Sequence, residues 1–116
     1  MPIIDEVINT IKKQIAKMLL GKKYSDYVDM DVVYNPDEEI FLITLKRLVF
    51  ENKINEAEEF LFDRAENNPT ENLQYIAIEF YTMVMEKSDE ELAEAGFDRS
   101  EVTTGVMDFR EVMGLA

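Results

Sequence analysis

The sequence contains no cysteine and no histidine, and each absence excludes a class of chemistry. Without cysteine there is no disulfide, no thiolate metal site, no iron–sulfur cluster and no thiol nucleophile. Histidine is the side chain whose ordinary pKa lies nearest neutral pH, so its absence excludes Ser-His-Asp triads and histidine-bound metals. Catalysis by carboxylates, lysine or tyrosine would need pKa values strongly shifted by burial. We therefore expect a protein that is not an enzyme and that holds no cofactor.

Glycine is also scarce, and the acidic residues lack the spacing of a metal site. The four glycines stand at positions 21, 96, 105 and 114, too far apart for a phosphate-binding loop. Acidic residues gather between positions 26 and 39, which suggests calcium at first sight. Counted from Asp29, however, the EF-hand positions that require a ligand, a glycine and a glutamate hold Val33, Tyr34 and Ile40. The pattern predicts no metal site.

The net charge of −13 is carried almost entirely by the second part of the chain. Residues 1–50 have seven basic and eight acidic side chains, whereas residues 51–116 have five basic and seventeen acidic ones, a net charge of −12. Such a surface repels nucleic acids and anionic membranes, and it suits either simple solubility or a basic partner. We expect no nucleic-acid partner and no membrane partner.

The beginning of the chain does not have the character of a targeting segment. Its acidic residues precede its lysines, opposite to the order in a secretory signal. Lys12, Lys13 and Lys17 also interrupt its most apolar stretch, which is then too polar to cross a bilayer. These features predict a cytoplasmic protein.

Apolar residues recur every three or four positions along most of the chain, which is the pattern of amphipathic helices. Residues 3–20 are the clearest case and predict an N-terminal amphipathic helix that ends at Gly21. Residues 21–36 break the pattern but contain three tyrosines and several valines, so we expect a loop packed on the body. A short strand at 31–34 is an alternative, although a single strand is unstable without a partner. Residues 37–116 predict a helical body, within one domain of residues 1–116.

The first half of this body predicts three helices. Two of them, residues 36–51 and 55–67, are joined by a short turn. The next, residues 70–87, is the fourth helix of the chain. It is apolar nearly all round and should be central. Thr70 is the expected cap of this fourth helix. The residues expected to face inward in the helices of residues 36–51 and 55–67 are Ile40, Phe41, Leu45, Leu48, Val49, Ala57, Phe60, Leu61 and Ala65.

The second half of the body contains two signals for the start of a helix. Ser88 with Glu91, and Asp98 with Glu101, each have the spacing of a capping box, in which two residues satisfy each other's backbone amides. Gly105 lies inside the last predicted helix, where glycine is costly, and it predicts a close crossing of helices. The chain is therefore predicted to be all-α, a compact bundle of about five to six helices.

Residues 41–69, FLITLKRLVFENKINEAEEFLFDRAENNP, resemble one tetratricopeptide repeat. The aromatic, aliphatic, small and proline positions of the repeat correspond to Phe41, Leu48, Ala57, Leu61 and Pro69. Leu45 and Arg64 depart from it, since small residues are expected there, and the following stretch does not repeat the signature. An ordinary antiparallel pair of helices has the same spacing. The segment predicts a TPR-like αα-hairpin.

Three stretches distributed over the whole chain carry a second resemblance. They are LLGKK at the end of the first helix, NKINEAEEFLFDRAE in the middle and MEKSDEELAEAGFDRSEVTTGVMDF in the tail. Together they are similar to a family of small uncharacterised bacterial proteins, classed as a domain of unknown function and typical of Gram-positive species. The resemblance implies a compact helical domain with TPR-like elements, and it implies no activity and no functional residues.

These observations favour a non-catalytic protein-interaction module, which binds a protein partner or a second copy of itself. Its predicted contact surface consists of apolar residues on the first and fourth helices, namely Ile4, Ile8, Ile11, Ile15, Ile78 and Met85. A homodimer through the N-terminal helix is one form, since residues 21–36 separate this helix from the body. The competing interpretation of the same helix is that it packs into the core. The alternative function is an acidic regulator or mimic that sequesters a basic or nucleic-acid-binding protein.

Overall fold

The computed structural model describes residues 2–21 and 31–115, with side chains from residue 6 onward. In these residues the chain forms α1 (Pro2–Leu20), α3 (Pro36–Phe50), α4 (Ile54–Asn67), α5 (Leu73–Met85), α6 (Asp89–Glu94) and α7 (Ser100–Val112). The described part contains no strand, so the predicted all-α class is confirmed. None of the described helices combines the length and the apolar character needed to cross a membrane.

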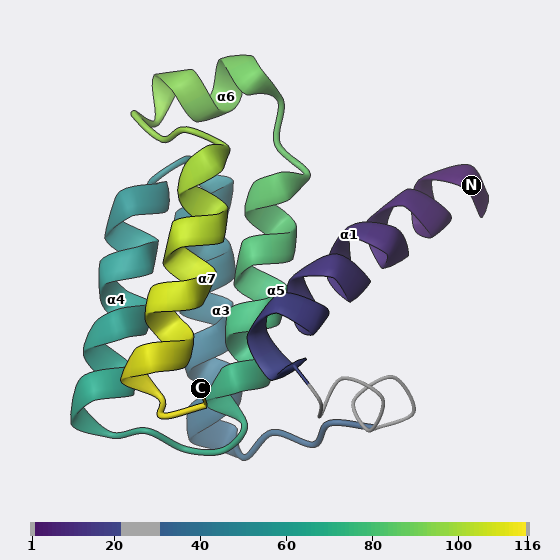
Figure 1. The fold of residues 1–116 in the computed structure, drawn as a ribbon. Helices are drawn as coiled ribbons and strands as arrows, with labels where there is room; N and C mark the ends of the chain where they lie inside the picture. The colour runs from purple at the N-terminus through teal and green to yellow at the C-terminus, as the bar shows by residue number, and fades with distance from the viewer. Residues whose placement is uncertain (1, 22–30, 116) are drawn as a thin grey trace.

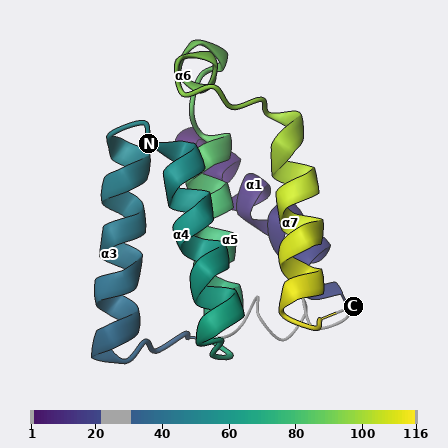
Figure 2. The ribbon, with the colours of Figure 1, turned by 90° about the vertical axis from the view of Figure 1, so that its left-hand side faces the viewer.

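Helix α5 is the centre of the bundle, as its apolar sequence predicted. It packs against α1, α3, α4 and α7. Figures 1 and 2 show α3, α4, α5 and α7 side by side, with α1 crossing the bundle obliquely and α6 lying across one end. Because neighbours surround α5, ten of its thirteen residues are buried. A central position of this kind buries a helix that is apolar on nearly all sides.

Capping residues explain where several helices begin. The Asn35 side chain accepts from the Glu38 backbone N–H at 2.8 Å, and Glu38 Oε1 accepts from the Asn35 N–H at 2.9 Å, a complete capping box for α3. The predicted box of Ser88 and Glu91 is confirmed at the start of α6. Each box satisfies two amides that a helix start would otherwise leave unpaired.

Two other predicted helix starts differ from the structure. Helix α5 begins at Leu73, so the prediction of Thr70 as its cap is wrong. The Thr70 hydroxyl instead donates to Glu38 Oε2 at 2.8 Å. The second predicted box is half formed, because Glu101 accepts from the Asp98 N–H at 2.6 Å while the Asp98 carboxylate accepts from Ser100. In both cases a tertiary or local hydrogen bond replaces the expected cap.

A tight turn makes α3 and α4 an antiparallel hairpin. Asn52 in this turn has a φ of 62°, the left-handed conformation that asparagine tolerates better than most residues. Its side-chain amide donates to the Glu91 carbonyl at 2.7 Å. The hydrogen bond connects the α3–α4 turn to α6 at the end of the bundle.

The C-terminal half of α1 belongs to the core. Ile15, Ala16, Leu19 and Leu20 are buried where α1 packs against α5 and α7. The N-terminal turns of α1 extend away from the bundle (Figure 1). The packing confirms the interpretation of this helix as a core element over its second half.

Part of the predicted loop lies within the described residues. Over residues 31–35 there is no strand, so the alternative of a strand at 31–34 is wrong. Val32 and Tyr34 pack against the core, as predicted for a loop that covers the body. Tyr24 and Tyr27 lie outside the described residues.

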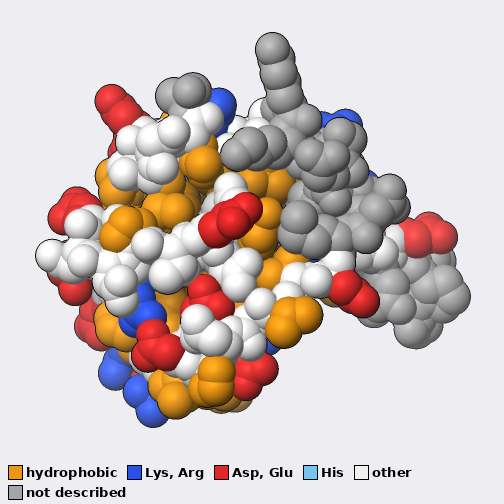
Figure 3. Space-filling view, turned by 90° about the horizontal axis from the view of Figure 1, so that it is seen from below, with side chains coloured by type: hydrophobic (Ala, Val, Ile, Leu, Met, Phe, Trp, Pro, Cys, Tyr) orange, Lys and Arg blue, Asp and Glu red, His pale blue; other side chains and the backbone are white. Residues whose placement is uncertain are grey.

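The lower face of the molecule, where α3 begins, shows apolar side chains in several groups between charged ones (Figure 3).

Candidate interaction surfaces

The structure separates the six residues of the predicted partner surface. Ile78 is fully buried and Ile15 is 2% exposed, so the prediction that these two form an open surface is wrong. The reason is that the helices packed around α5 leave no open face at Ile78, and α1 packs Ile15 onto α5 and α7. Ile8, Ile11 and Met85 are partly buried, and the side chain of Ile4 lies outside the described residues.

Three of the six residues nevertheless lie together. Ile11, Ile15 and Met85 line a hollow of about 380 Å³ between α1, the end of α5 and α7. Arg99 also lines it, but its guanidinium donates to the carbonyls of Met85 and Lys87 at 2.9 and 2.8 Å. These hydrogen bonds satisfy carbonyls at the C-terminal end of α5. Arg99 therefore caps the end of α5 at one side of this hollow.

The largest exposed apolar side chains on any one described helix lie on α3. Ile40 and Ile43 are each 65% exposed and Phe50 is 87% exposed. Since each residue turns an α-helix by about 100°, these three lie on one side of α3, opposite the buried Phe41 and Leu45. We call Ile40, Ile43 and Phe50 the α3 stripe. The expectation that Ile40 faces inward is wrong, and Phe60, at 39% exposed, is only partly covered by its stacking on Phe41.

The position of α3 in the bundle explains the exposure of the α3 stripe. Helix α3 lies at one edge of the bundle, with α4 and α5 on one side and no other described helix on the other (Figure 2). Large apolar side chains grouped on an open helix face are characteristic of contact sites, whereas single exposed ones are ordinary. The stripe is bordered by Glu39 near its N-terminal end and by Lys46 and Arg47 toward its C-terminal end, all exposed. The face thus combines apolar side chains with an acidic residue beside Ile40 and two basic residues between Ile43 and Phe50.

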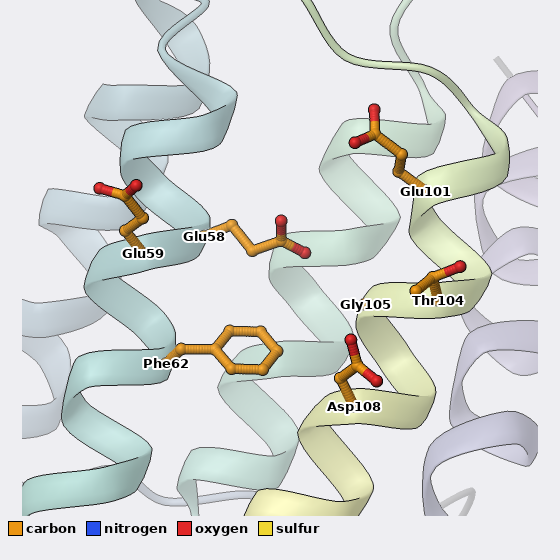
Figure 4. A pocket seen from close by; sticks show the side chains of 7 residues that line it. All are labelled: Glu58, Glu59, Phe62, Glu101, Thr104, Gly105 and Asp108. Atoms are coloured by element: carbon orange, nitrogen blue, oxygen red, sulfur yellow. The ribbon is translucent and has the colours of Figure 1, made fainter.

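A second feature is an acidic cleft between α4 and α7 (Figure 4). It has a volume of about 370 Å³ and is lined by Glu58, Glu59, Phe62, Glu101, Thr104, Gly105 and Asp108. Figure 4 shows the side chains of Glu58 and Phe62 projecting from α4 toward α7, and Glu101 and Asp108 on α7 one above the other. Among the described residues, no group of three or more acidic side chains is arranged to hold a metal ion.

One carboxylate of this cleft is tied to the core. The Tyr81 hydroxyl donates to Glu58 Oε2 at 2.6 Å, which connects α5 to α4. Burial raises the pKa of Glu58, and the charges of Glu101 and Asp108 raise it further against the opposing effect of the Tyr81 hydrogen bond. Burial, followed by the charge of Glu58, also raises the pKa of Tyr81. Tyr81 therefore stays protonated and acts as a fixed donor to Glu58.

Gly105 is the residue that lets this arrangement form. A Cβ at this position would lie 2.5 Å from the Tyr81 hydroxyl oxygen and would also overlap the Glu58 carboxylate. The prediction of a close crossing at Gly105 is confirmed, because α7 packs against both α4 and α5. The cleft, the hydrogen bond and the glycine are one packing unit.

The buried carboxylate of Glu38 lies at the N-terminal end of α3 and holds it in place. Glu38 is 4% exposed and accepts hydrogen bonds from the Asn35 N–H, from Thr70 and, at 3.1 Å, from the Asn72 amide. Burial alone would raise its pKa, but these hydrogen bonds and the charge of Arg64 together lower it. Arg64 also pairs with Asp37 and lies over the Phe41 ring. The ionised Glu38 therefore fastens the start of α3 to the segment before α5.

The fold and its surfaces define a small all-α domain with an open apolar face on one edge helix. The sequence matches a family of unknown function (DUF6483) over residues 2–114, and the chain belongs to this family. No curated protein and no solved structure matches the chain. This match confirms the prediction that the chain belongs to a family of unknown function. The bacterial origin and the TPR-like character of the α3–α4 hairpin stay predictions.

A signal for the α3 stripe was present in the sequence. Residues 40–50 have apolar side chains at Ile40, Ile43 and Phe50 as well as at the positions that became buried, so this helix is apolar on two sides. Such a helix needs partners on both sides, unless it contributes a contact surface. The choice between Ile40 and Leu42 as inward residues depended on where α4 and α5 pack, which periodicity alone does not specify.

Proposed function

We propose that this chain is a non-catalytic protein-interaction module whose contact surface is the outer face of α3. The observation that carries the proposal is the exposure of Ile40, Ile43 and Phe50 on one side of an edge helix. The α3–α4 hairpin is also the segment that resembles a tetratricopeptide repeat, a unit of interaction proteins. We place the module in the bacterial cytoplasm on the sequence arguments given above.

The energetic argument concerns what these three side chains contribute when covered. Fully burying a side chain of this size contributes about 1.5–3 kcal/mol, a favourable term that offsets part of the cost of bringing two molecules together. Leaving the stripe in water contributes nothing to the fold. The charged border of Glu39, Lys46 and Arg47 would then select the partner and its orientation.

The test is a photo-crosslinking amino acid placed at Ile43, with a matched version at Glu66, an exposed residue of α4. We expect covalent adducts from position 43 under native conditions and none from position 66. The Phe50→Glu change, made on the same helix face, should abolish the adduct while the unfolding midpoint stays the same. Equal labelling at both positions, or an adduct insensitive to Phe50→Glu, would contradict the assignment of the α3 stripe.

The alternative of an acidic regulator keeps one specific observation in its favour. Glu58, Glu59, Glu101 and Asp108 gather in the cleft between α4 and α7, within the half of the chain that carries a net charge of −12. Such a surface would attract a basic partner through long-range electrostatics. The two functions respond differently to salt. Affinity through the acidic cleft should fall steeply with ionic strength, whereas affinity through the α3 stripe should not, because its main contribution is apolar burial.

A further inference from the structure

We infer that the partner of the α3 stripe is the same stripe on a second copy of this chain, packed antiparallel about a two-fold axis at Ile43. The inference rests on the proposed function, since it takes the outer face of α3 as the contact surface. The evidence for the identity of the partner is the distribution of charge and apolar side chains along this one helix face.

An antiparallel register centred on Ile43 places complementary groups opposite each other. Ile43 meets Ile43 of the second copy, and Phe50 meets Pro36, an exposed residue at the start of the same helix. Glu39 lies opposite Arg47 of the second copy. Because the contact is two-fold symmetric, each of these pairs except the central one occurs twice.

Both charged residues of this register are available to a second copy. In the described part of the chain, the ion pairs involve Asp37, Glu51 and Lys53 near this helix, but neither Glu39 nor Arg47. A parallel arrangement would place Glu39 beside Glu39 and Arg47 beside Arg47, which is unfavourable. The charged pair is therefore complementary in the antiparallel orientation and not in the parallel one, and the same register places Ile40 opposite the aliphatic stem and ammonium of Lys46.

Contact through α3 also reduces the repulsion between two acidic molecules. Two copies with a net charge of −13 repel each other, and their approach is least unfavourable where basic residues face the partner. Lys46 and Arg47 provide this on α3, and α3 stands at an edge where no other described helix obstructs a second copy (Figure 2). The predicted dimer through α1 is less suitable, since Ile15 and Leu19 are committed to the core.

The first experiment measures the mass of the full chain in solution over a range of concentrations, by sedimentation equilibrium. We expect a monomer–dimer equilibrium, which Ile43→Glu removes by placing two carboxylates against each other at the axis. The matched control is Val7→Glu, which also changes an exposed apolar side chain, 54% exposed on α1, to glutamate. It should leave the dimer intact. A dimer lost in Val7→Glu and kept in Ile43→Glu would overturn the inference in favour of α1.

The second experiment exchanges the charges of the register. Glu39→Arg alone and Arg47→Glu alone should each weaken the dimer by roughly tenfold, through two symmetry-related ion pairs. The double change Glu39→Arg/Arg47→Glu should restore it, because each pair is re-formed with its signs reversed. Both changes oppose the helix dipole, so restoration cannot come from a more stable helix. A double variant weaker than either single one would overturn the antiparallel register.

The third experiment uses the natural absence of cysteine. Ile43→Cys should form a disulfide-linked dimer under mild oxidation, since symmetric residues at a two-fold axis approach closely enough for this bond. Val7→Cys provides the control and should oxidise no faster than a chance encounter allows. If the purified chain is a monomer and the Ile43→Cys variant does not cross-link, the inference is overturned. The proposed function then stands or falls separately, by whether the photo-crosslinker at position 43 captures a different protein.

Discussion

The Tyr81 hydroxyl donates a hydrogen bond of 2.6 Å to the Glu58 carboxylate, and both groups lie against Gly105 of α7. Three helices meet at this point: α5 supplies the donor, α4 the acceptor, and α7 the space that both require. Neither residue is predicted from sequence periodicity to contact the other. The contact makes Glu58 the most informative single position for testing the packing of the bundle.

Replacing Glu58 separates its hydrogen bond from its charge. Glu58→Gln keeps an acceptor for Tyr81 and removes the repulsion by Glu101 and Asp108, so we expect the free energy of unfolding to rise by up to about 1 kcal/mol at neutral pH. Glu58→Ala leaves the buried hydroxyl unpaired and should lower it by about 1–3 kcal/mol. Urea denaturation of both variants checks the prediction. Equal destabilisation by both changes would show that the charge is not the unfavourable component.

The pH dependence of the Glu58→Gln effect follows from the raised pKa. A carboxyl group whose pKa is higher in the folded state than in the unfolded state binds its proton more tightly when folded. The stabilisation that Glu58 gains from binding this proton is fully present below its ordinary pKa of 4.5. It is lost as the pH rises through the pKa of Glu58 in the folded state. The advantage of Gln over Glu at position 58 should therefore grow from acid to neutral pH. Unfolding midpoints of the two proteins at several pH values measure it.

Gly105→Ala should destabilise the protein even though alanine is the better helix former. The added methyl group would lie 2.5 Å from the Tyr81 hydroxyl oxygen, and the buried ring has little room to move. We expect a loss of about 1–3 kcal/mol from overpacking, which exceeds the roughly 1 kcal/mol gained in helix propensity. Thr104→Ala, at an exposed neighbouring position, is the control and should change stability little. Thermal unfolding of the double variant Tyr81→Phe/Gly105→Ala should show that part of the lost stability is recovered, because the clashing hydroxyl is gone.

Glu38 should have the opposite pH behaviour to Glu58. Its pKa is lowered in the folded state, so its contribution is present above the ordinary value of 4.5 and is lost as the pH falls through the folded value. Glu38→Gln should cost about 1–2 kcal/mol at neutral pH, because the charged acceptor of three hydrogen bonds is lost. The difference from the unmodified protein should shrink below pH 4.5. A difference independent of pH would mean that shape, not charge, holds the start of α3.

The revised inward and outward faces can be tested with one pair of isoleucines. Ile78 is fully buried on α5 and Ile40 is 65% exposed on α3. Ile78→Ala should therefore lower the free energy of unfolding by about 2–5 kcal/mol, whereas Ile40→Ala should change it by less than about 0.5 kcal/mol. Denaturant titrations of the two variants are directly comparable, since the chemical change is the same. A similar loss of unfolding free energy at both positions would show that the Ile40 side chain is buried.

Local patterns in the sequence predicted much of this fold because helices depend on neighbouring residues. The all-α class, the capping box of Ser88 with Glu91 and the close crossing at Gly105 were each predicted from short stretches of sequence, and each is confirmed. The absence of cysteine and histidine led to the expectation of no enzyme activity and no cofactor. That expectation rests on the residue types alone and stays a prediction.

Long-range contacts decided what local patterns left open. The sequence does not specify which helices surround α5, so Ile78 was predicted to be exposed and Ile40 to be buried, and the structure reverses both. Likewise, Thr70 has the chemistry of a cap, but the Glu38 carboxylate, 32 residues away in the chain, accepts its hydrogen bond.

What the sequence by itself determined is therefore the set of helices, because helix formation depends on spacings of three and four residues and on capping within one turn. What only the tertiary structure decided is which face of each helix is covered. Helix α3 is apolar on two sides, and periodicity cannot distinguish them. The packing of α4 and α5 covers Phe41, Leu45 and Val49, and leaves Ile40, Ile43 and Phe50 as the open face on which the proposed function depends.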